Sequence, residues 1–210
     1  MMSESAHALK LVTGLGNPGR EYDNTRHNAG FMVIDSLLEM LPGAFDKKDR
    51  CSSIFWEGRF KGKSLTLQKP LTFMNLSGKA VASLCARKKI SAQEILLVYD
   101  DMDLPLGRMR IRKNGSGGGH NGVQSVIDEI GSQDFPRLRI GIGRSEADNA
   151  QIDHVLSVFS PEESEIFEKV RQKAAEALKF ILSRDVDSAM NRYNNFDASS
   201  GAEKKTEKIS

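Results

Sequence analysis

The chain has 210 residues, of which 39% are hydrophobic and 28% charged, enough for one globular domain with a full core. It lacks an apolar run near the roughly 20 residues of a membrane span or a signal-peptide core, and Cys51 and Cys85 stand alone, so we expect a cytoplasmic protein without disulfides. The formal net charge of +2 excludes nucleic-acid binding by the whole surface, so any such partner needs a local basic patch.

Strand and helix patterns alternate along the chain. A buried strand is predicted at residues 9–15, and a helix then begins near Arg26 with Thr25 as its N-cap, because apolar residues recur at helical spacing as far as Leu41. Further strands are predicted at residues 54–60 and 64–68, which form a hairpin, and at 95–99, 108–112 and 137–142. Further helices are predicted at residues 76–87 and, after residues 120–122, as far as about residue 130. Two more are predicted at 161–183, after a capping box of Ser160 and Glu163, and at 187–193.

These patterns predict an α/β fold, in which residues 1–196 form a single catalytic domain with a twisted mixed β-sheet flanked by helices. Residues 95–99 are apolar throughout, which is typical of a central strand covered on both faces. That strand ends in a cluster of aspartates, at the position where α/β sheets place their sites. Residues 197–210 are small, polar and charged, and we expect a disordered tail.

Residues 14–19 read Gly-Leu-Gly-Asn-Pro-Gly and match the glycine spacing of dinucleotide-binding proteins. That motif normally runs directly into a helix whose first amides hold a pyrophosphate. Here Pro18 removes one amide, a polar run precedes the helix, and the nearest suitable acids, Asp35 and Glu39, fall inside the helical pattern. We therefore interpret the stretch as a glycine turn that places Asn17 close to a candidate base.

His27 is that candidate base. At the start of a helix the positive end of the dipole disfavours the imidazolium, and a neutral imidazole can accept a proton. A base also needs a partner that orients its other nitrogen, and Asp100, at the end of a buried strand, is the natural candidate. The alternative is an ordinary surface or capping histidine.

The aspartates after the central strand also allow a metal hypothesis, in which His27 or His120 would join Asp100, Asp101 and Asp103. No metalloprotease motif, calcium-loop spacing or cysteine pair supports it. Aspartates that cap the backbone of a turn explain Asp101 and Asp103 without a metal. We predict a site without a metal.

Three asparagines lie at loop ends or helix starts: Asn17, Asn75 and Asn121. Each is a possible N-cap. Together, near glycines and a base, they also offer neutral donors and acceptors for an ester and a peptide backbone.

Basic residues gather without any acid between residues 106 and 113, and more follow on a later strand. They are Arg108, Arg110, Arg112 and Lys113, then Arg137 and Arg139. A solvated edge strand is the usual explanation, but such a patch beside a candidate site also suits a phosphate backbone. The glycines at 115–119 lack the lysine and spacing of a phosphate-binding loop, so we interpret them as room for a bulky ligand or a moving gate.

Six motifs, in the family's order, resemble those of bacterial-type peptidyl-tRNA hydrolases. They are GLGNPG at 14–19, TRHNAG at 25–30, KPLTFMNLSG at 69–78, DLPLG at 103–107, GGHNG at 118–122 and RLRIGIG at 137–143. The resemblance implies a single-domain, monomeric, cytoplasmic esterase that needs no metal or other cofactor. Its substrate would be the ester that joins a peptide to the terminal ribose of tRNA, so that its action recycles tRNA from prematurely released chains.

The resemblance also implies roles for individual residues. His27 would activate water, and Asp100 would hold it in its basic form. Asn17 would sense the acylated amino group, which distinguishes peptidyl- from aminoacyl-tRNA, and Met74 would shape the cleft. The residues implied in substrate contact are Tyr22, Phe73, Asn75 and Asn121. The residues expected at tRNA phosphate are Arg112 and Arg139 from the resemblance, and Arg110 from the basic segment alone.

Some of the chain lies outside the resemblance. Residues 45–58 and 197–210 match no motif of the family, and Tyr99 and Asp101 depart from its commoner residues without affecting any implied role. Two other functions stay open from the residues alone: a non-catalytic RNA-binding module that uses the same arginines, and a dinucleotide-dependent oxidoreductase built on the glycine turn. A cysteine nucleophile is poorly supported, because Cys85 falls inside a predicted helix as a core residue.

Overall fold

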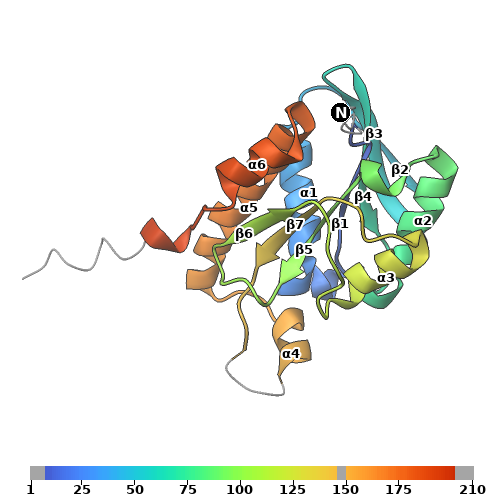
Figure 1. Ribbon diagram of the computed structural model, residues 1–210. Helices are drawn as coiled ribbons and strands as arrows, with labels where there is room; N and C mark the ends of the chain where they lie inside the picture. Colours follow the sequence, from blue (N-terminus) through green and yellow to red (C-terminus); the bar gives the residue numbers. More distant parts are fainter. Residues whose placement is uncertain (1–7, 146–149, 202–210) are drawn as a thin grey trace, which may run out of the picture.

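Seven strands form one sheet in the order β2-β3-β4-β1-β5-β7-β6, with helices on both faces (Figure 1). The computed structural model describes residues 8–145 and 150–201. The strands are β1 Leu11–Gly14, β2 Asp46–Arg50, β3 Ser53–Phe60, β4 Lys63–Pro70, β5 Ile95–Asp101, β6 Met109–Arg112 and β7 Arg137–Gly141. The helices are α1 Ala29–Met40, α2 Ser77–Lys88, α3 Asn121–Ile130, α4 Gln151–Leu156, α5 Pro161–Ser183 and α6 Val186–Tyr193. The 3₁₀ turns are η1 Arg20–Tyr22, η2 Arg26–Asn28, η3 Met74–Leu76, η4 Ala92–Glu94 and η5 Ser199–Gly201.

The sheet is mixed, as predicted. Strands β4, β1, β5 and β7 run parallel in its centre, and β2, β3 and β6 pair antiparallel with their neighbours. β5 is buried along its whole length, as its apolar run predicts, and β3 and β4 form the predicted hairpin. Because the central strands are parallel, their carboxyl ends meet at one edge of the sheet, where α/β folds bind ligands.

Helices α1, α5 and α6 cover one face of the sheet, and α2 and α3 cover the other (Figure 1). Since side chains alternate along a strand, Val12 packs toward the first group and Leu11 toward the second. Gly30 lets α1 approach the strand ends closely, because a Cβ there would lie 2.5 Å from the carbonyl oxygens of Leu15 and Val98. The start of α1 is thereby held against β1 and β5.

One strand and one α-helix were missed by the sequence analysis. β2 is an edge strand with five exposed side chains (Asp-Lys-Lys-Asp-Arg), so it shows no apolar alternation. It pairs with β3 through a tight turn in which Cys51 and Ser52 both take positive φ, the backbone geometry of a short hairpin. α4 has only six residues and no buried side chain or cap, which leaves no periodicity to recognise.

The predicted start of the first long helix is wrong by three residues. α1 begins at Ala29, after the turn η2, and the hydroxyl of Thr25 donates to the carbonyl of Tyr22 instead of capping a helix. His27 therefore lies in a 3₁₀ turn just before α1 and not within its first turn. The side-chain amide of Asn28 is bonded to the backbone of Asn17 in the loop after β1. These bonds hold residues 26–28 against that loop in a 3₁₀ turn, and the α-helix begins after it.

The predicted boundary of the tail is also too early. Asp197 bridges to Arg108, with which it forms an ion pair, and the backbone N–H of Ala198 donates to the carbonyl of Gly107. Ordered structure thus continues to Gly201, and the expectation for residues 202–210 lies outside the described residues. Within the part of the chain that the structure describes, no helix is long and apolar enough to cross a membrane.

The two cysteines are expected to differ sharply in reactivity. Burial raises the pKa of the Cys85 thiol on α2 to about 12, so only about one thiol in 10⁴ is ionised at pH 8, whereas Cys51 is partly exposed in a turn. Alkylation of the native protein at pH 8 should label Cys51 and spare Cys85 until the chain unfolds. Mass spectrometry of the labelled peptides measures this, and equal labelling would contradict the packing of α2.

Candidate active site

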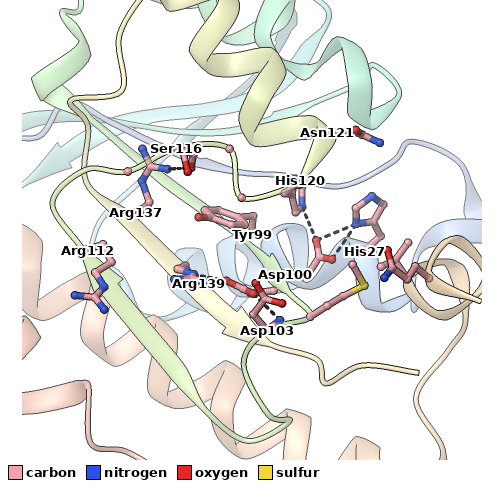
Figure 2. Close-up of a pocket in the computed structure, with 18 of the residues that line it drawn as sticks. His27, Tyr99, Asp100, Asp103, Arg112, Ser116, His120, Asn121, Arg137 and Arg139 are labelled. Atoms are coloured by element: carbon pink, nitrogen blue, oxygen red, sulfur yellow. Dashed lines mark hydrogen bonds and ion pairs between the residues drawn. The ribbon is translucent and has the colours of Figure 1, made fainter. Parts of the chain in front are cut away.

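A pocket of about 600 Å³ opens at the carboxyl ends of β5 and β7 (Figure 2). It is lined by Tyr99 and Asp100 of β5, by the glycine-rich loop at 114–119, by α4, and by His27 and His120. The pocket therefore lies at the edge of the sheet that the fold class favours for ligands.

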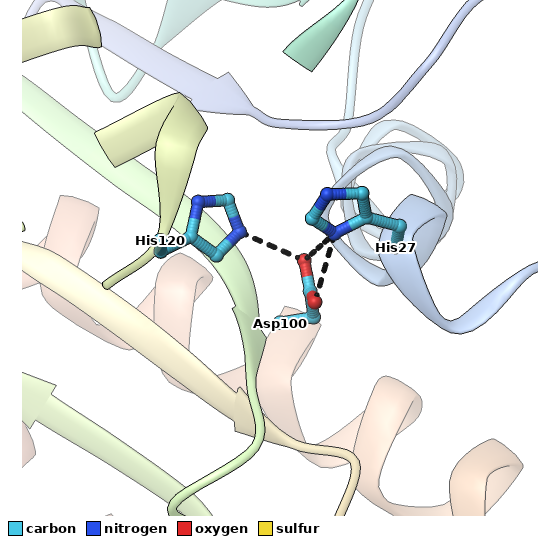
Figure 3. A group of neighbouring side chains, drawn as sticks. All are labelled: His27, Asp100 and His120. Atoms are coloured by element: carbon cyan, nitrogen blue, oxygen red, sulfur yellow. Dashed lines mark hydrogen bonds and ion pairs between the residues drawn. The ribbon is translucent and has the colours of Figure 1, made fainter. Parts of the chain in front are cut away.

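Asp100 is bonded to both imidazole rings (Figure 3). Nδ1 of His27 lies 3.0 Å from each carboxylate oxygen, and Nε2 of His120 lies 3.0 Å from one of them. Asp100 is only 1% exposed, whereas both rings border the pocket. The expected contact between Asp100 and His27 is present, and a second histidine completes the group.

The hydrogen bonds fix the protonation state of the group. Burial alone would raise the pKa of Asp100, but the hydrogen bonds from His27 and His120, together with the positive charge that either ring adds whenever it is protonated, outweigh burial and hold the pKa well below its usual range. An ionised carboxylate only accepts, so the nitrogens that face it carry the protons. Nδ1 of His120 in turn accepts from the backbone N–H groups of Gly122 at 3.1 Å and Val123 at 3.3 Å, so that ring is neutral.

His27 is left with one free nitrogen. Its Nδ1–H is committed to Asp100, and its Nε2 makes no hydrogen bond to any described residue. A neutral imidazole in this tautomer has its lone pair on Nε2, at the border of the pocket. This is the arrangement of a general base that is oriented through its other nitrogen.

The same three side chains, His27, Asp100 and His120, are the one group among the described residues whose ligand atoms lie close enough to hold a metal, within 4.8 Å of one another. The hydrogen bonds do not fit that role. To bind a metal through Nε2, His120 would have to lose the proton there while Nδ1 still accepts two backbone N–H groups, which leaves an unfavourable imidazolate. The arrangement suits proton transfer better than metal ligation.

Asp101 and Asp103 belong to the turn and not to this group. Asp101 pairs with Arg139 and accepts the backbone N–H of Asp103 at 2.8 Å, while Asp103 pairs with Arg144. Asp101 caps the turn, as the alternative to a metal cluster predicts, whereas Asp103 forms an ion pair and caps no backbone N–H among the described residues.

Asn17 is held beside the turn that carries His27, but it does not line the pocket. It is 7% exposed, and its side-chain oxygen accepts the backbone N–H of Met74 at 2.8 Å. The amide of Asn28 bonds the backbone N–H and carbonyl of Asn17 at 2.8 and 3.0 Å. The segment around Met74 is thereby attached to the turn that carries the base.

The other residues predicted to contact substrate lie in or next to η1, η3 and α3. Asn121, the first residue of α3, is exposed and lines the pocket. Phe73, 58% exposed, and Asn75, also exposed, flank the buried Met74, and Tyr22 is partly exposed in η1. These last four do not line the pocket itself, and their contact with substrate stays a prediction.

The arginines near the pocket differ in what they contact (Figure 2). Arg112 is exposed, lines the pocket and makes no ion pair within the described chain, whereas Arg139 lines the pocket while paired with Asp101. Arg137 is buried and donates to the carbonyl of Ser116 at 2.9 Å, so it holds the glycine-rich loop onto β7. Arg112 is thus the cation best placed for an external phosphate.

Acidic side chains neutralise more of the basic segment at 106–113 than the sequence suggests. Arg108 pairs with Asp197, and Lys113 pairs with Asp187 on α6. Both acids come from parts of the chain far from residues 106–113, so local sequence could not reveal them. Arg110 lies opposite Arg139 in the β6–β7 ladder but does not line the pocket.

Two parts of the site were not predicted. His120 was considered only as a metal ligand, although its position at the N-cap of α3, directly after a glycine run, is a signal for a fixed ring. α4 contributes Gln151, Ile152 and Val155 to the pocket lining, and no sequence motif marked it.

The fold and the site define a single-domain α/β hydrolytic enzyme in which a histidine, oriented by a buried aspartate, borders an open pocket. Comparison with known proteins agrees and is more specific. The chain belongs to the peptidyl-tRNA hydrolase family, whose family model, described as "Peptidyl-tRNA hydrolase", matches residues 11–202.

Individual relatives cover almost the whole chain. A peptidyl-tRNA hydrolase of Aquifex aeolicus (strain VF5) is 48% identical over 189 residues, 90% of this chain and 98% of that protein. One of Synechococcus sp. (strain JA-3-3Ab) is 47% identical over 91% of this chain and 85% of its own. The crystal structure of peptidyl-tRNA hydrolase from Acinetobacter baumannii is 32% identical with a TM-score of 0.85, over 91% of this chain and 97% of that one.

Replacing Asp100 by Asn is expected to disable the site without unfolding it. The amide presents N–H groups where His27 now finds only acceptors, so the ring is driven to the tautomer that lacks a lone pair on Nε2. We expect kcat to fall by about 10³–10⁴-fold, as in other sites that lose the orienting carboxylate. Steady-state kinetics and circular dichroism check this. Asp49→Asn, on the exposed edge strand β2 and outside the pocket lining, is the control and should stay near wild type.

Proposed function

We propose that this chain hydrolyses the ester between peptide and tRNA in peptidyl-tRNA, with His27 as general base. The observation that carries the proposal is the free Nε2 of His27, whose other nitrogen is held by an ionised Asp100. Water gives its proton to Nε2 as its oxygen attacks the ester carbonyl. The tetrahedral intermediate then expels the ribose oxygen, which takes the proton back from the imidazolium. The products are a peptide carboxylic acid and a tRNA with a free terminal hydroxyl.

The asparagines supply the second part of the proposed mechanism. Asn121 borders the pocket, and Asn17 is held rigidly by its bonds to Met74 and Asn28, which suits recognition of the acylated amino group. An amide donor placed at the developing oxyanion contributes on the order of 10²–10³ in rate. Tyr22, Phe73 and Asn75 are assigned to substrate contact on the resemblance alone.

The tRNA is proposed to reach the pocket along β6 and β7. Arg112 has no internal ion pair in the described chain, and Arg139 and Arg110 lie opposite one another next to it in the ladder. Cations on one strand face suit a phosphate backbone. Arg112 is the strongest candidate because its charge is not neutralised by a neighbouring acid.

The proposed reaction needs no metal or cofactor. General-base catalysis contributes about 10²–10⁴-fold in rate, and an ester is already a reactive bond, so a base and amide donors are sufficient. The two thiols are unpaired in the structure, in keeping with the proposed location in the cytoplasm. A monomer is proposed on the resemblance alone.

Replacing His27 by Ala tests the base directly. Turnover of an N-acetylated aminoacyl-tRNA should fall by about 10²–10⁴-fold while tRNA affinity is retained, because the base acts on water and not on binding. Added imidazole should restore part of the rate in the alanine variant, which leaves a cavity, but not in a His27→Gln variant, which fills it. Turnover of His27→Ala within a few-fold of wild type would sink the assignment.

Replacing Arg112 by Ala tests the tRNA path. In a His27→Ala background, where the substrate is not consumed, the variant should bind peptidyl-tRNA more weakly and lower the slope of log Kd against log salt by about one. Arg108→Ala is the control, since Arg108 is already paired with Asp197 and lies outside the pocket lining. If both variants leave the slope unchanged, these arginines are solvated surface only.

A further inference from the structure

The turn η2 places three consecutive side chains against three different parts of the fold. In a 3₁₀ turn there are three residues per turn, so successive side chains point about 120° apart. His27 contacts Asp100 on β5, and Asn28 contacts Asn17 after β1. The third side chain, Arg26, points toward the connection between α4 and α5, and the proposed mechanism gives it no role.

Arg26 is bonded to that connection by several separate contacts. Its backbone N–H donates to the carbonyl of Ser157 at 3.0 Å, and its Nε donates to the hydroxyl of the same residue at 3.1 Å. Its Nη2 pairs with Glu163 of α5 at 2.6 Å, and its guanidinium lies 4.6 Å from the ring centre of Phe159. The residue is only 6% exposed.

This burial is unfavourable for stability alone. The remaining nitrogen of Arg26, Nη1, is buried without any hydrogen-bond partner among the described residues, and an unsatisfied buried donor loses its bonds to water without replacement. The ion pair with Glu163 offsets only part of this cost, because the Glu163 side chain is partly exposed and water weakens the attraction. The contacts of Arg26 therefore indicate that the residue is needed to hold another part of the fold in position.

What Arg26 positions is α4. Ser157 directly follows this helix, and its hydroxyl and backbone N–H both donate to the carbonyl of His154. A six-residue helix is not stable by itself, so its place depends on its attachments. At its other contact, the His154 ring is bonded to the carbonyl of Gly143 at 2.9 Å. α4 is thus held between the turn of the base and the exit of β7.

The face that α4 presents to the pocket suits an apolar or mixed ligand. Gln151, Ile152 and Val155 line the pocket, and Ile152 is 74% exposed. Arg26 is bonded to Ser157, which follows α4, and Arg26 precedes His27 directly in η2. A shift of the Arg26 side chain would therefore move α4 relative to the base.

We propose that Arg26 is a positioning residue, which sets α4 at a fixed distance from His27 and so controls substrate binding and not the chemical step. The inference rests on the proposed function in one respect, that substrate occupies the pocket bordered by His27. Arg26 itself touches no reacting atom. Its planar fork, with donors for Ser157 and Glu163 and a face for Phe159, is what the role requires, and lysine cannot reproduce it.

The test compares Arg26→Lys, Ser157→Ala and Glu163→Gln in steady-state turnover of an N-acetylated aminoacyl-tRNA. We expect Arg26→Lys to raise KM by about 10-fold with kcat within about threefold, because α4 is displaced while the base is intact. Ser157→Ala should act in the same direction, and the double variant should not be additive in kcat/KM. Hydrogen exchange of the α4 amides should accelerate in Arg26→Lys. Arg171→Gln, which removes another arginine contact on α5 away from the pocket, is the matched control and should change none of these.

Each other outcome overturns the proposal. Unchanged KM and kcat with only a lowered Tm would make Arg26 a purely structural residue. A large loss of kcat at constant KM would place its action on the base and not on α4. If Arg26→Lys fails to fold, Ser157→Ala and Glu163→Gln carry the test, and normal KM in both refutes the inference. Failure of the base assignment is distinguishable, since His27→Ala would then stay active whatever Arg26 does.

Discussion

The site depends on one buried negative charge. Asp100 lies one residue before the end of β5 and is 1% exposed, and a carboxylate so far from water is tolerated only when it is paired and hydrogen-bonded. Two imidazole rings provide this from opposite sides, one from η2 and one from the start of α3. Because His120 is kept neutral by backbone donors, the carboxylate imposes a tautomer on both rings. The lone pair on Nε2 of His27 is therefore a consequence of the hydrogen bonds that stabilise the charge of Asp100.

The turn η2 delivers that geometry because it is tighter than an α-helix. Its three side chains bind three parts of the fold: His27 binds Asp100 on β5, Asn28 binds Asn17 after β1, and Arg26 binds Ser157 after α4. With evenly spaced directions, no two of these anchors compete for one side of the turn. Gly30 then allows α1 to begin directly against the strand ends, so the turn cannot slide along the sheet.

The parts that the sequence predicted are those with local causes. The apolar run of β5, the hairpin and the placement of His27 and Asp100 at element ends all follow from adjacent residues. β2 was missed because an all-charged edge strand is held by its neighbour alone, and α4 because its position comes from Arg26 and His154. The acids that neutralise the basic segment come from α6 and the C-terminal segment. The bond from His120 to Asp100 exists only once α3 and β5 meet in space.

Asp100 and Arg26 are both buried and charged, but the fold surrounds them differently, and the difference indicates separate roles. Asp100 accepts from two imidazole N–H groups, and that of His27 is shared between both oxygens, so the carboxylate is preorganised in its ionised state. One nitrogen of Arg26 has no hydrogen-bond partner among the described residues although the side chain contacts three of them, so these contacts fix its position without satisfying every donor. A fold optimised for stability alone would carry an apolar side chain at position 26. The arginine is explained if catalysis needs the proton of His27 fixed on Nδ1 and substrate recognition needs α4 fixed beside it. The turn η2 provides both.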